Sequence, residues 1–241
     1  MIYPILKRAT DIVVASVAIL LLFPVSLIII LFLKLTDEGK IFFFQQRVGF
    51  KNKHFALWKF RTMVSNSSSM GSGNLTVKND PRITTMGRIL RPNKLDELPQ
   101  FINVLKGEIS LVGPRPIPIA NYEAYSEEIK RKIYDVKPGI TGIGSLVFRN
   151  EEAILSASGE DPNVFYKREV APYKGALELW YQKNASTLTD FKLLILTGWF
   201  ILFPDSKLLT TFFRDLPKNH SLGIKQIEKV RTKYPVELSN S

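Results

Sequence analysis

The longest apolar stretch of the chain lies near its N-terminus. Residues 12–33 form a run of 22 residues without a charge, preceded by Lys7, Arg8 and Asp11 and followed by Lys34. At about 1.5 Å per residue, a helix of this length reaches across a hydrocarbon core of roughly 30 Å. A cleaved signal peptide fits poorly, because the run exceeds an ordinary apolar h-region and no small-residue cleavage site follows it. The pattern therefore predicts a membrane-embedded helix.

Two topologies remain open for this helix. Its length and hydropathy favour a single transmembrane span that is kinked at Pro24. Pro24 also stands at the centre of the run, where it removes a helix hydrogen bond, and Ser26 could satisfy the carbonyl that is freed. Basic residues flank both ends of the run, which places both ends on the cytoplasmic side under the positive-inside tendency. That placement favours a re-entrant hairpin, which enters one leaflet and returns.

Beyond the apolar run, the pattern predicts an α+β fold that is predominantly helical. Residues 42–46 and 55–60 are rich in aromatic residues around a turn at 48–53, which predicts a small β-hairpin. Residues 65–79 are rich in Ser, Gly and Asn and predict a mobile loop. Helices are predicted from a cap at Asp80 onward and at residues 98–106, 123–135, 171–185 and 189–203.

The last of these helices has two interpretations. Residues 191–203 carry a single charge, Lys192, and Trp180 and Trp199 lie nearby in the sequence. Such a segment fits a helix that lies in the membrane interface. A buried core helix explains the same pattern equally well.

The composition narrows the chemistry that the chain can perform. It holds no cysteine and only two histidines, His54 and His220, among 241 residues. This excludes a disulfide framework, a thiolate zinc site, an iron–sulfur cluster, a cysteine nucleophile and a multi-histidine metal site. Catalysis would then depend on carboxylates, hydroxyls, Lys and Arg.

The positive charge is concentrated in one block. The chain carries a net charge of +11, and residues 40–116 hold 13 Lys and Arg against 4 Asp and Glu, or +9. Such an excess indicates anionic partners: phosphorylated substrates, an acidic membrane surface or nucleic acid. A membrane-anchored nucleic-acid-binding protein and a non-catalytic membrane scaffold therefore stand beside an enzyme as hypotheses, although the sequence shows no nucleic-acid-binding motif.

Two adjacent carboxylates, Asp96 and Glu97, stand inside this basic block at the expected start of a helix. First-turn acids are common because the exposed N–H groups and the helix dipole favour them, so the pair alone is weak evidence. Arg91, Lys94 and Arg115 could hold phosphate oxygens beside the pair. A carboxylate that such cations keep ionised could act as a nucleophile or hold a magnesium ion between substrate phosphates.

A series of short motifs follows in a fixed order along most of the chain. The series comprises Lys7-Arg8 with Asp11, Phe42-Phe43-Phe44-Gln45-Gln46-Arg47-Val48-Gly49, Lys59-Phe60-Arg61-Thr62-Met63, Asp80-Pro81-Arg82-Ile83-Thr84 with Gly87-Arg88, Leu95-Asp96-Glu97-Leu98-Pro99-Gln100, Asn103-Val104-Leu105-Lys106-Gly107, Gly113-Pro114-Arg115-Pro116 and Lys137-Pro138-Gly139-Ile140-Thr141-Gly142. With these motifs the chain resembles the bacterial sugar transferases. They are monotopic phosphoglycosyl transferases, which move a phosphosugar from a nucleotide diphosphosugar to a polyprenyl phosphate.

The resemblance implies roles for individual residues. Asp96 would be the nucleophile that attacks the sugar-linked phosphate of a UDP-sugar and releases UMP, and Asp96 and Glu97 would hold Mg²⁺. The phosphosugar would then pass from Asp96 to undecaprenyl phosphate, with ping-pong kinetics. That transfer is the first membrane step in the synthesis of a bacterial glycan (exopolysaccharide, O-antigen or glycoprotein). The remaining implied contacts are those of Arg91 and Arg115 with phosphate, of Lys59 and Thr62 in the same site, and of Arg149 with the nucleotide sugar.

The resemblance also implies a monotopic architecture. Residues 1–39 would form a re-entrant membrane helix, residues 40–205 a catalytic domain with amphipathic interfacial helices, and residues 206–241 a C-terminal extension. The family's membrane helix breaks at Ser-Pro; this chain has Phe23-Pro24, which keeps the proline, so the re-entrant topology is favoured. Residues 143–148 depart from the polar stretch of the family, and the sugar is therefore not specified.

The same resemblance implies a location and partners. The expected location is the bacterial inner membrane, with the catalytic domain on its cytoplasmic face. The expected partners are a nucleotide diphosphosugar, a polyprenyl phosphate and anionic lipid, and not nucleic acid. A homo-oligomer stays open.

Overall fold

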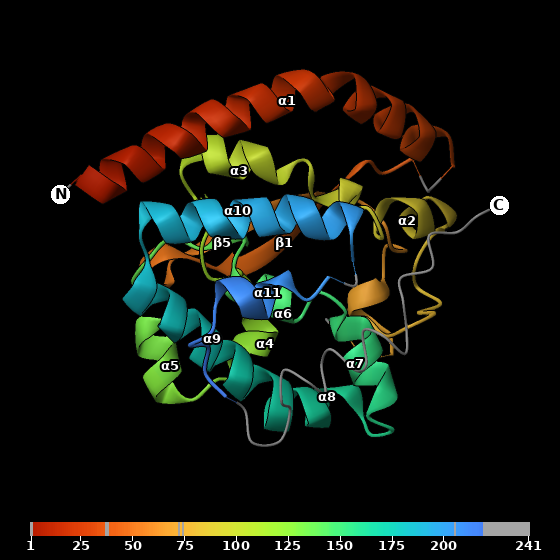
Figure 1. The fold of residues 1–241 in the computed structure, drawn as a ribbon. Coiled ribbons are helices and arrows are strands. Elements are labelled where there is room, and N and C mark those ends of the chain that lie inside the picture. The colour runs from red at the N-terminus through yellow and green to blue at the C-terminus, as the bar shows by residue number, and fades with distance from the viewer. Residues whose placement is uncertain (1, 37–38, 72, 74, 205, 219–241) are drawn as a thin grey trace.

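The computed structural model describes residues 2–36, 39–71, 73, 75–204 and 206–218 (Figure 1). Helices surround two small sheets, which confirms the predominantly helical α+β class. The larger part of the predicted C-terminal extension, residues 219–241, lies outside the described residues. The helices are α1 (Ile2–Thr36), α2 (Thr85–Leu90), α3 (Gln100–Lys106), α4 (Ile119–Tyr122), α5 (Glu127–Lys132), α6 (Ile143–Val147), α7 (Glu151–Ala157), α8 (Pro162–Phe165), α9 (Ala171–Asn184), α10 (Thr187–Leu202) and α11 (Leu208–Phe212), with the short turns η1 (Phe50–Asn52), η2 (Ser67–Ser69), η3 (Leu95–Glu97) and η4 (Tyr166–Val170).

The predicted β-hairpin is confirmed and gains a third strand. β1 (Phe42–Val48) pairs antiparallel with β2 (His54–Phe60), and β4 (Ile117–Pro118) pairs with the other edge of β1. Aromatic rings pack across the hairpin, as in the edge-to-face contact of Phe44 with Trp58 at 4.9 Å between ring centroids, which stabilises this register. A second sheet joins β3 (Ser110–Val112) and β5 (Gly139–Thr141) in parallel. The motif at residues 137–142 thus supplies a strand.

The helix predicted from Asp80 begins later than expected. Residues 80–83 are irregular, and α2 starts at Thr85, with Thr84 accepting the N–H of Gly87 as the N-cap. Asp80 instead forms a buried ion pair with Arg82 at 2.6 Å, because Arg82 needs a counter-charge. The guanidinium of Arg82 also donates to the backbone carbonyls of residues 67, 70, 73 and 75, which lie in the segment predicted as a mobile loop. The described residues of that segment form a loop, as predicted, with the short turn η2 inside it. The hydrogen bonds from Arg82 hold this loop against the start of α2.

α1 is a single helix with Pro24 inside it. Figure 1 shows it as a shallow arch over one side of the molecule, not as two arms folded against each other. An internal proline removes one backbone hydrogen bond and bends a helix, which explains the arch. Among the described residues, α1 is the one helix that is long and apolar enough to cross a membrane.

Polar contacts fasten the N-terminal part of α1 to the body of the molecule. Lys7 Nζ donates to the carbonyl of Val112 in β3 at 2.8 Å. Arg8 donates from both terminal nitrogens to two carbonyls near the end of α3, at 2.7 and 2.8 Å. Asp11 is buried and accepts the N–H of Leu111 at 2.9 Å. The charged residues that precede the apolar run therefore bind the membrane helix to the sheet and to α3.

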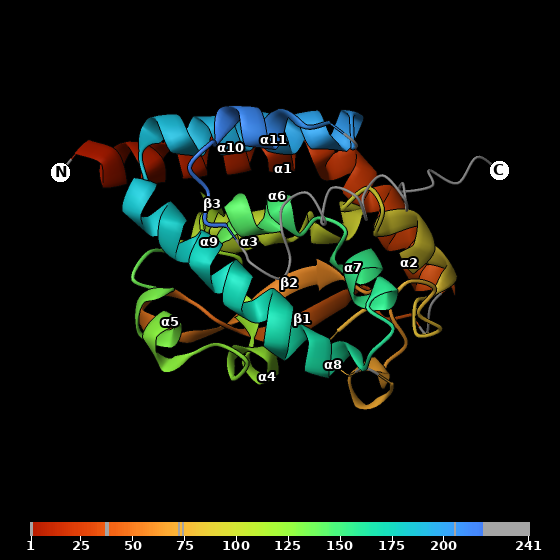
Figure 2. The ribbon, with the colours of Figure 1, turned by 60° about the horizontal axis from the view of Figure 1, so that its bottom comes forward.

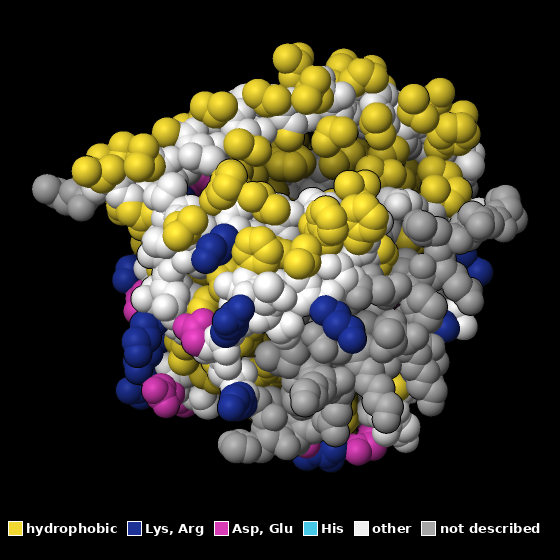
Figure 3. Space-filling view, viewed as in Figure 1, with side chains coloured by type: hydrophobic (Ala, Val, Ile, Leu, Met, Phe, Trp, Pro, Cys, Tyr) yellow, Lys and Arg dark blue, Asp and Glu magenta, His cyan; other side chains and the backbone are white. Residues whose placement is uncertain are grey.

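α10 lies beside α1 (Figure 2), with one side buried in the core and the other side exposed. Leu193, Leu196 and Phe200 are fully buried in the main core. The opposite side of α10 is apolar and exposed, and Figure 3 shows these side chains continuing the apolar surface of α1. The exposed apolar side chains of α10 comprise Leu188, Phe191, Ile195, Trp199, Ile201 and Leu202. The molecule thus presents one broad apolar side, formed by α1 and α10.

Candidate active site

The two adjacent carboxylates occupy η3, a short turn between α2 and α3. Lys94 precedes it in the left-handed conformation, with φ of 57°, which redirects the chain after α2. Leu95 and Leu98 flank the acids and pack on an apolar cluster formed by Ile29, Leu33, Phe60 and Leu90. This cluster, called here the α1–turn cluster, brings residues of α1 directly beneath the turn. The turn that carries the two acids therefore rests on α1.

Lys59 of β2 joins the two acids. Its Nζ lies 2.9 Å from Glu97 Oε1 and 3.9 Å from Asp96 Oδ2. Arg115 Nη2 donates to the same Glu97 oxygen at 2.8 Å. Asp96 is 5% exposed, and its Oδ1 has no hydrogen-bond partner within the described part of the chain. Four of the predicted site residues are thus brought together from three distant segments.

The two acids have opposite electrostatic environments. Burial raises the pKa of Asp96, while Lys59, Lys94 and Arg91 act against that rise. Burial would also raise the pKa of Glu97, but Arg115 and Lys59 lower it well below its ordinary value. Glu97 is therefore a fixed anion that holds two cations, and Asp96 is the carboxylate with an oxygen available for chemistry.

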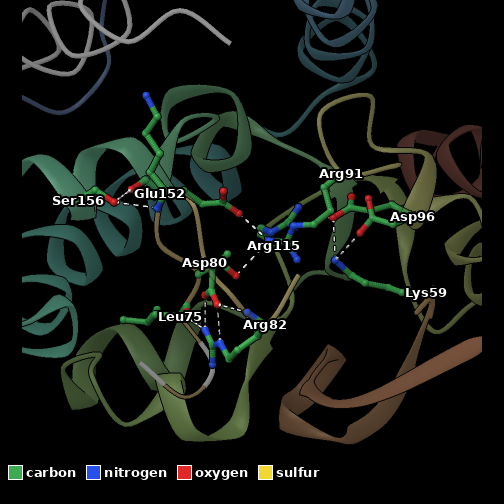
Figure 4. A network of polar contacts seen from close by, with 12 residues as sticks. Lys59, Leu75, Asp80, Arg82, Arg91, Asp96, Arg115, Glu152 and Ser156 are labelled. Atoms are coloured by element: carbon green, nitrogen blue, oxygen red, sulfur yellow. Dashed lines mark hydrogen bonds and ion pairs between the residues drawn. The ribbon is translucent and has the colours of Figure 1, made fainter. Parts of the chain in front are cut away.

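Arg91 is near the turn, but its hydrogen bonds lead away from it. Its Nη2 donates to Glu152 Oε1 of α7 at 2.5 Å and to Thr76 Oγ1 at 3.0 Å (Figure 4). Lys78 N–H donates to Ser156 of α7, so the same helix also holds the segment that carries Thr76. Arg91 is therefore placed between the acids and α7.

Two predicted site residues make contacts of a different kind. Thr62 is buried, its carbonyl accepts the N–H of Thr84 at 3.0 Å, and a Cβ on Gly87 would lie 2.2 Å from that carbonyl oxygen. This contact fixes α2 against the end of β2. Arg149 donates to the carbonyl of Phe200 in α10. Pro24 is exposed on the membrane helix.

Sequence reasoning missed several residues that organise the site. Glu152 of α7 pairs with Arg91, and Glu178 of α9 accepts the N–H of Arg115. Burial raises the pKa of Glu178 to about 7. One signal marks Glu178 in the sequence: it lies four residues after Lys174 and three before Tyr181, on a face of α9 that is otherwise buried.

The donor set at the turn fits a magnesium ion. Magnesium prefers oxygen ligands and is commonly held by one or two carboxylates together with substrate phosphates. Asp96 supplies a buried oxygen that has no partner among the residues the structure describes, next to the carboxylate of Glu97. No group of three or more His, Cys, Asp and Glu side chains is placed to hold a metal among the described residues. A magnesium ion at this turn would therefore take its remaining oxygen ligands from a substrate.

Comparison with known proteins agrees with the arrangement. The sequence profile of the family "Bacterial sugar transferase" matches residues 2–204. The UDP-glucose:undecaprenyl-phosphate glucose-1-phosphate transferase of Escherichia coli (strain K12) is 46% identical over 140 residues, which cover 57% of this chain and 30% of that protein. The undecaprenyl-phosphate galactose phosphotransferase of Salmonella typhimurium is 35% identical over 215 residues, 83% of this chain and 41% of that protein.

A third relative matches over most of its own length. An uncharacterized sugar transferase of Bacillus subtilis (strain 168) is 40% identical over 196 residues, which cover 80% of this chain and 85% of that protein. The chain therefore spans less than half the length of the two relatives named for an activity, and nearly the whole of the third. On its motifs, its matched length and this likeness, the chain belongs to the bacterial sugar transferase family.

Proposed function

We propose that this protein is a phosphoglycosyl transferase, which moves a sugar phosphate from a UDP-sugar to undecaprenyl phosphate. The observation that carries the proposal is Asp96, a buried carboxylate with one oxygen unpaired in the described chain, in a turn surrounded by cations. The names of the two relatives agree on undecaprenyl phosphate and differ in the sugar, which is glucose in one and galactose in the other. The proposal therefore commits to the acceptor and to a nucleotide donor, and leaves the sugar open.

In the proposed first step, Asp96 attacks the phosphorus that carries the sugar. A bond forms between an Asp96 oxygen and this phosphorus, the bond to the bridging oxygen of the diphosphate breaks, and UMP leaves with the electron pair. In the second step, an oxygen of undecaprenyl phosphate attacks the same phosphorus. This frees the Asp96 carboxylate and yields undecaprenyl diphosphosugar. A covalent intermediate divides one difficult transfer into two easier ones.

The neighbouring residues would position the reacting groups. Lys59 lies between both carboxylates and limits their movement. Arg115 has a partly exposed guanidinium, so it can keep its bond to Glu97 while it presents further N–H groups to a diphosphate. Glu97 and Asp96 would hold Mg²⁺, which supplies charge neutralisation on the diphosphate when it is bound.

The apolar side formed by α1 and α10 supports a monotopic placement. We propose that α1 enters the inner membrane and returns to its cytoplasmic face, with α10 in the interface beside it. Both parts of α1 contact the same body: Arg8 and Asp11 bind α3 and β3, and Ile29 and Leu33 pack in the α1–turn cluster. A helix that crosses a bilayer would carry these two contact regions to opposite sides of it.

Turnover of purified protein tests the proposed reaction. The protein is incubated with Mg²⁺, undecaprenyl phosphate and single UDP-sugars from a panel, and UMP release is followed. We expect release with at least one sugar, and Asp96→Asn should reduce it by at least about 1000-fold, since the nucleophile is lost. Asp135→Asn is the matched control, because Asp135 forms an exposed ion pair with Lys51 away from the turn.

A donor labelled with ³²P in the sugar-linked phosphate separates the two steps. Without the acceptor, label should attach to the parent protein and not to Asp96→Asn. Full turnover by Asp96→Asn would refute the nucleophile. Turnover without attached label would point to direct transfer between the two substrates.

A further inference from the structure

The loop that carries Arg115 is held at its backbone by side chains from distant elements. In this Arg115 loop, residues 113–116, the N–H of Arg115 donates to Glu178 Oε1 at 3.3 Å. The carbonyl of Arg115 accepts the hydroxyl of Tyr134 at 2.8 Å. The next carbonyl, that of Pro116, accepts Arg47 Nη1 at 2.7 Å. Both polar backbone groups of Arg115 are thus bound by side chains.

The residues that bind the loop are buried where polar groups cost stability. Tyr134 is 1% exposed, Glu178 is 3% exposed and Arg47 is 8% exposed. Oε2 of Glu178 has no partner among the described residues, and a Cβ on Gly144 would lie 2.3 Å from Oε1. A buried carboxylate with an unsatisfied oxygen lowers the stability of a fold. Its presence behind a site residue points to a role other than stability.

We infer that Glu178 and Tyr134 are positioning residues of the transferase, which hold the backbone of Arg115 so that its guanidinium stays beside Glu97 and the donor diphosphate. This inference rests on the proposed function, in which Arg115 contacts phosphate. Glu178 and Tyr134 act through Arg115, and we call them the Arg115 clamp. Arg47 donates to the next carbonyl along the chain, that of Pro116, and is not counted as part of the clamp.

The clamp lowers the entropy cost of placing the long side chain of Arg115 on a phosphate. Arginine loses much rotamer freedom when it binds, and that cost falls if its backbone is already fixed. Pro114 and Pro116 restrict the backbone on both sides of Arg115 but donate no N–H groups. Backbone bonds already hold the N–H of Gly113 and the carbonyl of Pro114. Glu178 and Tyr134 add the bonds to the N–H and the carbonyl of Arg115 itself. Small misplacements of a phosphate-binding group lower a rate strongly, by up to about 100-fold for 1 Å.

Variants that keep or remove the clamp's hydrogen bonds test it. Glu178→Ala removes the bond to the Arg115 N–H, and Tyr134→Phe removes the bond to the Arg115 carbonyl together with the bond that the Tyr134 hydroxyl accepts from the Ile117 N–H. Glu178→Gln keeps an acceptor oxygen and should retain turnover within about threefold, whereas Glu178→Ala should lower kcat/KM for the UDP-sugar by about 10- to 100-fold. Tyr134→Phe should lower it by about 10-fold. Tyr173→Phe is the matched control on α9, because the Tyr173 hydroxyl is buried with no partner among the described residues. It should leave turnover unchanged.

A double-mutant cycle separates positioning from a general loss of structure. In Arg115→Ala protein, assayed at high enzyme concentration, Glu178→Ala and Tyr134→Phe should each change the residual rate by less than about twofold. Equal losses in both backgrounds would overturn the clamp, because they would not pass through Arg115. If Glu178→Ala does not fold, Tyr134→Phe and Glu178→Gln still decide the question.

The outcomes also distinguish the clamp from the proposed function. Full turnover by Arg115→Ala would refute the phosphate-binding role on which the clamp depends. A strong loss in Arg115→Ala, together with full turnover in Glu178→Ala and Tyr134→Phe, would refute the clamp alone. Absence of turnover in the parent protein with every UDP-sugar would count against the proposed function itself.

Discussion

Asp96 and Glu97 are neighbours in the sequence, yet the fold gives them different tasks. Glu97 accepts from both Lys59 and Arg115, and its charge is fixed by them. Asp96 shares Lys59 only at 3.9 Å and keeps one oxygen without a partner in the described chain. The sequence predicted a carboxylate site because cysteine and a histidine cluster are missing. The sequence could not show which of the two carboxylates the cations bind, because that depends on where β2 and the Arg115 loop meet the turn.

Glu97→Gln should destabilise the protein as well as inactivate it. The substitution removes the anion shared by two cations that are largely buried, and an uncompensated buried charge costs about 3–5 kcal/mol. Arg115 is partly exposed, so we expect about 2 kcal/mol, measured by thermal unfolding in detergent. Glu128→Gln on α5 is the control, because its pair with Lys132 is exposed and contributes little. Equal shifts of the two melting temperatures would contradict this expectation.

The buried carboxyl of Glu178 should make stability depend on pH. Its pKa rises from 4.5 to about 7 on folding, so the folded state binds more protons between these values, and stability falls as the pH rises through 7. The loss is at most about 3 kcal/mol. Glu178→Gln should therefore melt at a higher temperature than the parent at pH 8 and at a similar temperature near pH 4.5. A constant difference across this range would argue against the buried titration.

Glu152→Gln tests the contact that competes for Arg91. In the structure this guanidinium is bound to Glu152 at 2.5 Å, and that carboxylate competes with a substrate phosphate for the positive charge of Arg91. Removing the charge should lower KM for the UDP-sugar by about two- to fivefold and leave kcat within about twofold, because a partly exposed ion pair contributes little energy. Steady-state kinetics measure both. A higher KM would mean that Glu152 aids binding by orienting Arg91.

At the scale of elements, hydrophobic pattern and capping residues predicted more than polar contacts did. The aromatic hairpin and the α9 and α10 helices follow from local pattern, and Gly107 ends α3 in the left-handed conformation, which glycine adopts readily. Asp80 was read as a helix cap, which is the commoner role of an Asp before Pro. In the structure Asp80 pairs with Arg82, whose guanidinium donates to the carbonyls of residues 67, 70, 73 and 75. Such a contact has no periodic signal in the sequence.

Arg82→Lys should loosen the segment that this guanidinium holds. Lysine keeps the charge near Asp80, but its single ammonium cannot replace the planar fork that reaches several carbonyls. We expect limited proteolysis within residues 65–79 to become at least about fivefold faster, with the remaining structure intact by circular dichroism. Arg88→Lys in α2 is the matched control, since its side chain is exposed. Unchanged proteolysis of the Arg82 variant would show that the segment is held by other contacts.

At the scale of the whole molecule, the membrane helix is also a structural element of the catalytic body. Hydropathy predicted its place in the sequence, and the charges on its flanks favoured a return to the same side. The contacts of both its parts with the body could not be read from the sequence, because they depend on residues of β3, α2 and α3. Those contacts support the proposed re-entrant topology, because they keep both parts of α1 on one body.

Cysteine labelling tests this topology in a chain with no native cysteine. Ile2→Cys and Lys53→Cys lie at exposed positions before and after the arch, so both should react with a membrane-impermeant maleimide from the cytoplasmic side of inverted vesicles. Neither should react in vesicles of the opposite orientation. Reaction of the two positions from opposite sides would show a transmembrane span.

The α1–turn cluster has a practical consequence for the preparation of this protein. Leu33 is fully buried in the cluster that supports the turn with Asp96, so α1 supplies one wall of the candidate site. Removal of residues 2–36 to obtain a water-soluble fragment would leave Leu90, Leu95 and Leu98 without that wall. We therefore expect a fragment without residues 2–36 to lose the proposed turnover, so that activity is best sought with α1 present and in lipid or detergent.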